Sequence, residues 1–181
     1  MADPFITADD LVDHLGRGDA ADPGLVIAVD AACEIVRNWT GQPINLTTSD
    51  TIVFDGKGTD TLLLPGGPVS TVRSVTVDGE EATDYVLRSD GILIRSQTSD
   101  GVVPSWPEGR QNITVVYDHG WDTPDVPGDI AMVALSIAAR IAVQGPLIQE
   151  SMGQTSVRYA TASTDLTSVE KGILRKYRRA L

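Results

Sequence analysis

Residues 62–79 constrain the fold more strongly than any other part of the sequence. They read Leu-Leu-Leu-Pro-Gly-Gly-Pro-Val-Ser-Thr-Val-Arg-Ser-Val-Thr-Val-Asp-Gly, which predicts a hairpin of two strands joined by a corner that the two prolines fix. Gly66 and Gly67 are free to take positive φ in that corner, and Asp78-Gly79 predicts a tight turn after the second strand. No run of similar strength carries catalytic side chains, so the sequence favours a role in assembly over an enzyme.

The composition of the 181-residue chain is that of one large domain, or of one domain with an insert. Its single cysteine, Cys33, excludes an intramolecular disulfide and is expected to be buried among small apolar neighbours. The N-terminus has neither a basic region nor an apolar run, so we expect no signal peptide. The longest apolar stretch, 130–139, is too short to span a membrane. The sequence therefore predicts a soluble protein made in the cytoplasm.

Charge is unevenly distributed along the chain. Residues 1–170 carry all 25 acidic side chains and 9 of the 14 basic ones, a formal net charge of −16. Residues 171–181 carry five basic side chains and no acidic one. Because DNA binding requires cations that displace condensed counterions, the acidic part is expected to repel DNA.

Two helices are predicted in the first 48 residues. Thr7 can cap the first, and Asp22-Pro23 begins the second, which ends before Gly41. The second helix has two apolar stripes, which suggests packing against two neighbours. The minor stripe is therefore a candidate subunit interface and comprises Ile27, Ala31 and Ile35.

Between residues 51 and 118 the apolar residues alternate with a period of two, which predicts five or six short antiparallel strands. Segments 52–54 and 61–64 are expected to form a hairpin around the loop 55–58. Unequal spacing of the valines after residue 69 predicts a β-bulge near Arg73. Later strands are predicted at 85–88, 92–95 and 113–117.

A third helix is predicted from Ile130 to Ala142. It is apolar nearly all round, with Arg140 as its single charge, and such a helix is buried on every side. In a chain of this size a second copy most easily supplies that burial. The candidate interface residues on this helix are Ile130, Ala131, Leu135, Ala139 and Ala142.

A last helix is predicted after Thr167, which forms a capping box with Glu170. It is expected to pack through Val169, Ile173, Leu174 and Tyr177. Its basic residues recur at spacings of three and four and would share one face, which we treat as a candidate docking surface for an acidic partner; a solvated helix face is the alternative. These residues are Lys171, Arg175, Arg178 and Arg179.

Together the elements predict an α+β fold, in which a helical core of about four helices carries an antiparallel β module inserted between the second and third helices. The expected parts are an N-terminal helical part (1–48), the inserted β module (49–120) and a C-terminal helical part (121–181). The two helical parts are expected to form one core.

Side chains for catalysis or metal binding are sparse. His14 and His119 are far apart in the sequence and, with one cysteine, cannot supply a zinc site. The segment 55–60 lacks the alternating ligands and terminal glutamate of a calcium loop. We therefore expect no catalytic residue, no metal and no cofactor.

The order of the segments resembles a known family, the head-to-tail connector (adaptor, head-completion) proteins of long-tailed double-stranded DNA bacteriophages. The resemblance rests on Leu-Leu-Leu-Pro-Gly-Gly-Pro-Val, the Val-Thr-Val-Asp-Gly turn, the Trp-Pro loop, Val-Val-Tyr-Asp-His-Gly-Trp, and Val-Pro-Gly-Asp-Ile before an alanine-rich helix. Gln149-Glu150-Ser151-Met152-Gly153 leading to Val157-Arg158-Tyr159 also matches. The resemblance extends from Ala8 to about Tyr177.

This resemblance implies a structural virion protein that forms a ring, commonly of twelve subunits, in the neck at the portal vertex of the capsid. It implies contacts with the portal protein and with a downstream neck or tail-completion protein, no membrane, and a channel through which DNA passes without specific binding. Simpler connectors of this family are largely helical, so the β module is a departure whose role stays open.

Two other function classes remain open on the residues alone. One is a sugar-binding accessory module that would use Trp106 and Trp121, with Tyr117 beside them, as a stacking platform. The other is a carboxylate-based hydrolase that would use Glu80, Glu81 and Asp84.

Overall fold

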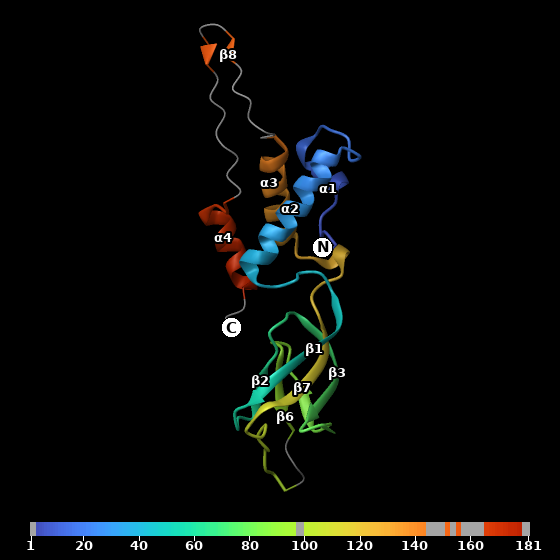
Figure 1. Cartoon of the computed structure of the whole chain (residues 1–181), viewed down its shortest axis with the longest axis vertical. Helices are drawn as coiled ribbons and strands as arrows, with labels where there is room; N and C mark the ends of the chain where they lie inside the picture. Colours follow the sequence, from blue (N-terminus) through green and yellow to red (C-terminus); the bar gives the residue numbers. More distant parts are fainter. Residues whose placement is uncertain (1–2, 97–99, 144–150, 153–154, 157–164, 179–181) are drawn as a thin grey trace. The chain divides into compact units, whose positions relative to one another are not determined.

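The structure, a computed structural model, describes residues 3–96, 100–143, 151–152, 155–156 and 165–178. The chain is α+β and divides into two compact units, a helical unit (Met1–Gly41 with Asp125–Arg178) and a β unit (Gln42–Pro124). Figure 1 shows α1 to α4 gathered in the first unit and β1 to β7 in the second. In the sequence, strands β1 to β7 all lie between α2 and α3.

The first two helices of the helical unit are α1 (Ala8–Leu15) and α2 (Pro23–Thr40). Thr7 Oγ1 accepts a hydrogen bond from the Asp10 N–H at 3.1 Å, and Asp10 Oδ2 accepts one from the Thr7 N–H at 2.7 Å, so a capping box begins α1. Asp22 caps α2, and Gly41 ends it in the left-handed conformation. These boundaries confirm the prediction for both helices.

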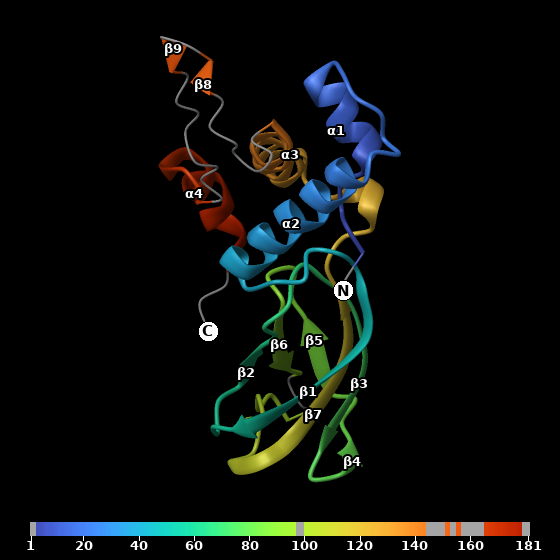
Figure 2. The ribbon, with the colours of Figure 1, turned by 45° about the horizontal axis from the view of Figure 1, so that its top comes forward.

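The later elements of this unit are α3 (Gly128–Val143), α4 (Ser168–Leu174) and the 3-10 turn η2 (Arg175–Tyr177), and a further 3-10 turn, η1 (Thr123–Asp125), spans the boundary between the two units. Helix α3 contacts α1, α2 and α4, and in Figure 2 α1 and α4 flank it on opposite sides. A short pairing of β8 (Ser151–Met152) with β9 (Thr155–Ser156) precedes α4. Most of the motifs noted at 149–153 and 157–159 lies outside the described residues.

Two antiparallel sheets make up the β unit. The four-stranded sheet has the order β1-β7-β3-β4, and the three-stranded sheet has the order β2-β6-β5. The strands are β1 (Thr47–Gly56), β2 (Thr61–Leu63), β3 (Val69–Val77), β4 (Glu80–Glu81), β5 (Tyr85–Leu87), β6 (Ile92–Arg95) and β7 (Gly109–His119).

The pairing corrects two hairpin predictions. β1 pairs with β7 and β2 pairs with β6, so β1 and β2 form no hairpin, and neither do β2 and β3. The segments 57–60 and 64–68 instead carry the chain from one sheet to the other. The tight turn is confirmed, with Asp78 at φ 52° and Gly79 at φ 85° between β3 and β4, and so is the bulge, which lies between Val72 and Ser74.

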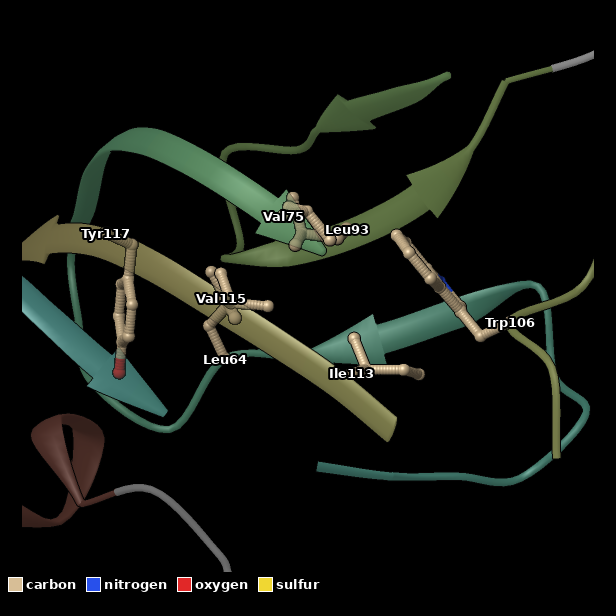
Figure 3. Close-up of a cluster of buried hydrophobic side chains, with 7 residues drawn as sticks. All are labelled: Leu64, Val75, Leu93, Trp106, Ile113, Val115 and Tyr117. Carbon is tan, nitrogen blue, oxygen red and sulfur yellow. The ribbon is translucent and has the colours of Figure 1, made fainter. Parts of the chain in front are cut away.

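The core of the β unit lies between the two sheets. Alternate residues of β7 point into it, as predicted for residues 113–117, and Figure 3 shows Ile113, Val115 and Tyr117 spaced along this strand, with Val75 of β3 beside Leu93 of β6. Trp106, from the loop before β7, closes one end with its side chain buried. The buried cluster comprises Leu64, Val75, Leu93, Trp106, Ile113, Val115 and Tyr117.

Asp118, near the end of β7, accepts hydrogen bonds from both neighbouring strands at the points where their pairing is irregular. Arg73 of β3 donates two hydrogen bonds of 2.7 Å to its carboxylate, and the Ser49 N–H of β1 donates another of 2.7 Å. These hydrogen bonds, those of Arg73 first, hold the pKa of Asp118 below its usual value. Register shifts occur on both sides, between Thr47 and Asp50 and within β3, so one carboxylate secures two irregular pairings.

The proline corner is packed against His119. Neither Gly66 nor Gly67 uses the positive φ that is open to glycine. Gly66 is required for space instead, because a Cβ on it would lie 2.4 Å from Nδ1 of His119. That ring cannot move aside easily, since it stacks on Tyr117 at 4.8 Å and its Nε2 lies 3.0 Å from Asp50 Oδ2.

We therefore expect Gly66→Ala to lower the free energy of unfolding by about 2 kcal/mol, because the added methyl group overpacks a site with no room to relax. Chemical denaturation followed by tryptophan fluorescence measures the change. Gly172→Ala is the control, since a Cβ on Gly172 of α4 meets nothing within 4 Å, and it should be neutral or slightly stabilising. Equal stabilities of wild type and Gly66→Ala would contradict the packing argument.

Candidate subunit interface and docking surface

The predicted interface on α3 divides into a buried and an accessible part. Ile130 is fully buried within its own chain, so it belongs to the helical core and offers no surface to a partner. The periodicity identified its face correctly as apolar but could not tell which apolar face turns inward. The remaining four predicted residues are half-buried and leave part of their surface accessible: Ala131, Leu135, Ala139 and Ala142.

The exposed side of α3 also carries Met132, which the sequence did not single out and which is 55% exposed. Met132, Leu135 and Ala139 recur at helical spacing, so they form one stripe along the helix. We call these three residues, with Ala131 and Ala142, the α3 stripe.

The minor stripe of α2 is likewise accessible. Ile27 is 65% exposed, whereas Ala31 and Ile35 are half-buried. Val26 beside Ile27 is exposed as well. We call Ile27, Ala31 and Ile35 the α2 stripe; Asp30 and Glu34 lie beside it on the same helix.

The segment that contains α4 and η2 forms side-chain contacts with both ends of α3. Arg140 donates hydrogen bonds of 2.6 and 3.2 Å to the two carboxylate oxygens of Glu170, which also accepts the Thr167 N–H in the confirmed capping box. At the other end Asp129 accepts a hydrogen bond of 2.7 Å from the Tyr177 hydroxyl and forms an ion pair with Lys176. Both charges of α3 are therefore engaged within the helical unit.

These contacts also set the protonation of the two carboxylates. Burial alone would raise the pKa of Glu170, but the hydrogen bonds from Arg140 and Thr167 outweigh it and hold the pKa below its usual value. Burial opposes ionisation of Asp129 too, and the hydrogen bonds from Lys176 and Tyr177 lower its pKa in the same way. Both groups are thus ionised at neutral pH.

The predicted basic face is shorter than the sequence suggested. The α-helix ends at Leu174 and continues as a 3-10 turn, and Arg178 has extended backbone, so Arg178 does not share a helical face with Lys171 and Arg175. The Arg178 guanidinium lies 5.7 Å from the centre of the Trp39 ring. Arg179 lies outside the described residues. Lys171 and Arg175 are exposed and remain candidates for docking.

The prediction that Val169 packs within the core is wrong, because its side chain is exposed. Glu170 and Leu174, four residues apart, are the buried positions of α4. Val169 precedes Glu170 by one residue, which turns it about 100° away round the helix.

Several residues of the two alternative functions are engaged in the structure, whereas Glu80 and Glu81 are exposed. Trp106 and Tyr117 are buried in the β core and cannot form an exposed sugar platform, while Trp121 is half-buried. Arg95 donates a hydrogen bond of 3.1 Å to Asp84 and lies over the Trp106 ring, so Asp84 belongs to an ion pair. Within the described ranges there is no group of three or more potential metal ligands. None of the helices they contain has the length and hydropathy to cross a membrane.

We expect Glu170→Gln to lower the free energy of unfolding at pH 7 by about 2 kcal/mol, because it removes a charge-assisted pair with Arg140. The pKa of Glu170 is lowered on folding, so its contribution is present above about pH 4.3 and is lost as the pH falls through the lowered pKa. The variant should therefore lose less stability than wild type between pH 5 and 3, measured by urea denaturation at each pH. The exposed Glu80→Gln is the matched control, and a Glu170→Gln profile parallel to that of wild type would contradict the assignment.

Comparison with known proteins places these surfaces in context. The sequence matches the family described as "HCP: Head completion protein" over residues 5–180. Comparison with curated proteins gives no match.

The fold is similar to chains of gene transfer agent (GTA) particles. A chain of "Virion of native gene transfer agent (GTA) particle" has a TM-score of 0.61 at 18% identity, with 97% of this chain and 91% of that chain covered. A chain of "Neck of empty GTA particle computed with C6 symmetry" has a TM-score of 0.58 at 20% identity, with 97% and 91% covered. A chain of "Neck of native GTA particle computed with C12 symmetry" has a TM-score of 0.53 at 16% identity, with 96% and 90% covered. At these identities the likeness shows a shared fold.

Proposed function

The chain belongs to the head completion protein family, and we propose that it forms a closed ring of identical subunits in the neck of a virus particle. In this position the ring joins the portal protein to a downstream neck or tail-completion protein and extends the channel through which DNA passes. We further propose that residues 1–48 and 121–181 form one connector core into which the β module, 49–120, is inserted.

The observation that carries this proposal is the pair of uncharged apolar stripes on the helical unit. Large apolar side chains are exposed on α2 and α3, and both charges of α3 are engaged within the unit. Contiguous exposed apolar surface on a small protein commonly marks a protein–protein interface. A subunit that used the α2 stripe on one neighbour and the α3 stripe on the other would make the heterologous contacts that close a ring.

Two further observations support a ring around DNA. The similar chains described above come from particles whose necks were computed with C6 and C12 symmetry, which supports cyclic assembly, with twelve subunits as the proposed number. The chain has a formal net charge of −11, which disfavours binding to the DNA backbone. A ring of such subunits would let DNA slide rather than adhere.

We expect Ile27→Glu and Met132→Glu each to abolish ring assembly while leaving the fold intact. Both side chains are exposed in the single chain, so the charge is solvated there, but assembly would bury it without a partner. Negative-stain electron microscopy of particle necks, with circular dichroism of the purified variant, provides the measurement.

The matched control is Asn38→Glu, which adds the same charge at an exposed polar position of α2. It should assemble like wild type. Normal rings from Ile27→Glu and Met132→Glu would show that the stripes are not the subunit contact.

For attachment to the portal protein we propose the basic residues after Glu170. Lys171 and Arg175 are exposed, and the acidic residue of α4, Glu170, is engaged by Arg140, whereas Lys176 is already paired with Asp129. Arg178 and Arg179 would add charge to the same end of the chain. Exposed charges of this kind mainly govern association rate and salt sensitivity, which suits docking on an acidic ring.

We expect Lys171→Glu combined with Arg175→Glu to reduce attachment to filled capsids without changing the stability of the chain, because neither side chain contributes to the core. Occupancy is measured by quantitative mass spectrometry of purified capsids at two salt concentrations. Lys57→Glu combined with Arg110→Glu changes the net charge equally on the β unit and should attach normally. If capsids carry the Lys171/Arg175 variant at the wild-type level, these two residues form only a solvated surface.

A further inference from the structure

The three-stranded sheet β2-β6-β5 has an apolar outer face that the described residues leave open. Its strands are unbroken apolar runs at 62–64, 85–87 and 92–94. Leu62, Leu87 and Leu93 point inward to the core, as Figure 3 shows for Leu93. The residues between them point outward, and the register sets Leu63 opposite Ile92 and Val86 opposite Ile94.

This pattern differs from that of an antiparallel sheet that faces water. Such a sheet alternates apolar and polar residues, whereas strands that are apolar on both faces are covered on both faces. Leu63 is 51% exposed and Val86 is 57% exposed, so the cover is missing from the single chain. We define the outer face of this sheet as Leu63, Val86, Ile92 and Ile94.

The opposite side of the β unit carries a second uncharged face. On the outside of the four-stranded sheet, Val53 of β1 is 48% exposed and lies beside Thr114 of β7, which pairs with Thr76 of β3. Charged side chains lie toward the ends of this face and on its edge strand β4, where Glu81 pairs with Thr76. We define the face as Thr51, Val53, Ser74, Thr76, Thr114 and Val116. Because the two sheets enclose one core, the two outer faces point in opposite directions.

We infer that the β units of neighbouring copies stack head to tail, with the outer face of β2-β6-β5 in one copy packed on the outer face of β1-β7-β3-β4 in the next. The inference rests on the proposed ring. A cyclic ring requires each copy to offer two different surfaces that fit one another, and these two faces meet that requirement within one unit. Flat uncharged β faces pack on one another about 10 Å apart.

A second copy is favoured as the occupant because the chain itself supplies the complementary face. The β2-β6-β5 face is apolar and the facing surface is built of Thr, Ser and Val, so neither would bury a charge at the centre of the contact. The inserted β module would thereby contribute a second set of subunit contacts in addition to the helical stripes.

The test places the photo-cross-linking amino acid p-benzoylphenylalanine at position 86 of the full-length chain, within assembled particles. We expect ultraviolet light to produce multimers of this chain, with cross-linked peptides that contain residues 47–56 or 109–119 of another copy. Ser89 is exposed and lies in the turn after β5, so the same label at position 89 is the matched control and should leave the chain monomeric on a denaturing gel.

Other cross-links overturn the inference. A link between the two β2-β6-β5 faces would indicate a two-fold contact, a link within one chain would indicate that its own residues cover the face, and a link to another protein would identify a different occupant. Absence of any link in particles that contain the chain would also overturn it. Absence of the chain from the particles would instead refute the proposed neck function.

A second variant, Leu63→Lys combined with Val86→Lys, measures the effect on assembly. Both side chains are exposed in the single chain, so the thermal unfolding midpoint should not change. We expect the number of copies per particle to fall about tenfold, which corresponds to about 1.4 kcal/mol of lost association free energy. Wild-type occupancy of this variant would overturn the inference while leaving the helical ring contact intact.

Discussion

Two hydrogen bonds between the segments that enter and leave the β unit allow the rest of the structure to form. The Leu46 N–H donates to the Trp121 C=O at 2.7 Å, and the Trp121 N–H donates to the Ile44 C=O at 2.9 Å. The pairing requires unusual backbone: Ile44 has φ 64°, which is strained for a β-branched residue, and a Cβ on Gly120 would lie 2.3 Å from the Asn45 carbonyl oxygen. Because entry and exit are paired, the β strands can be inserted between α2 and α3 without separating two helices that pack together.

Helix α3 uses both of its charges within the helical unit and leaves apolar side chains exposed. Asp129 and Arg140 are the charges of α3, and each is tied to the segment that contains α4. Because each charge of α3 is paired within the unit, α3 presents no unpaired charge to a neighbouring subunit. An apolar surface of this kind suits an obligate assembly, in which interfaces resemble a domain core cut in half.

The sequence predicted the local features of the fold correctly, namely helix caps and a tight turn. It did not predict which strands pair. Caps at Thr7 and Thr167 and the turn at Asp78-Gly79 depend on neighbours within four residues, so their chemistry identifies them. Strand pairing depends on residues that are far apart, and nothing near 55–58 reveals that β1 pairs with β7. Among the site residues, periodicity identified the apolar faces of α3 but not that Ile130 is buried and Met132 exposed. The unbroken apolar runs of β2, β5 and β6 were the available signal for the outer face of the small sheet.

The acidic groups of this chain divide into two kinds with different physical roles. Asp118, Asp129 and Glu170 have lowered pKa values because each accepts several hydrogen bonds at a joint: Asp118 between β1, β3 and β7, and the other two between the ends of α3 and α4. The ionised carboxylates accept the hydrogen bonds that connect these elements. Protonation at low pH should therefore weaken these contacts first in both units. Exposed carboxylates elsewhere give the chain much of its formal net charge of −11, and a net charge of this sign favours solubility and disfavours contact with the DNA backbone. The carboxylates that accept several hydrogen bonds therefore act on stability, whereas the exposed ones act through the net charge.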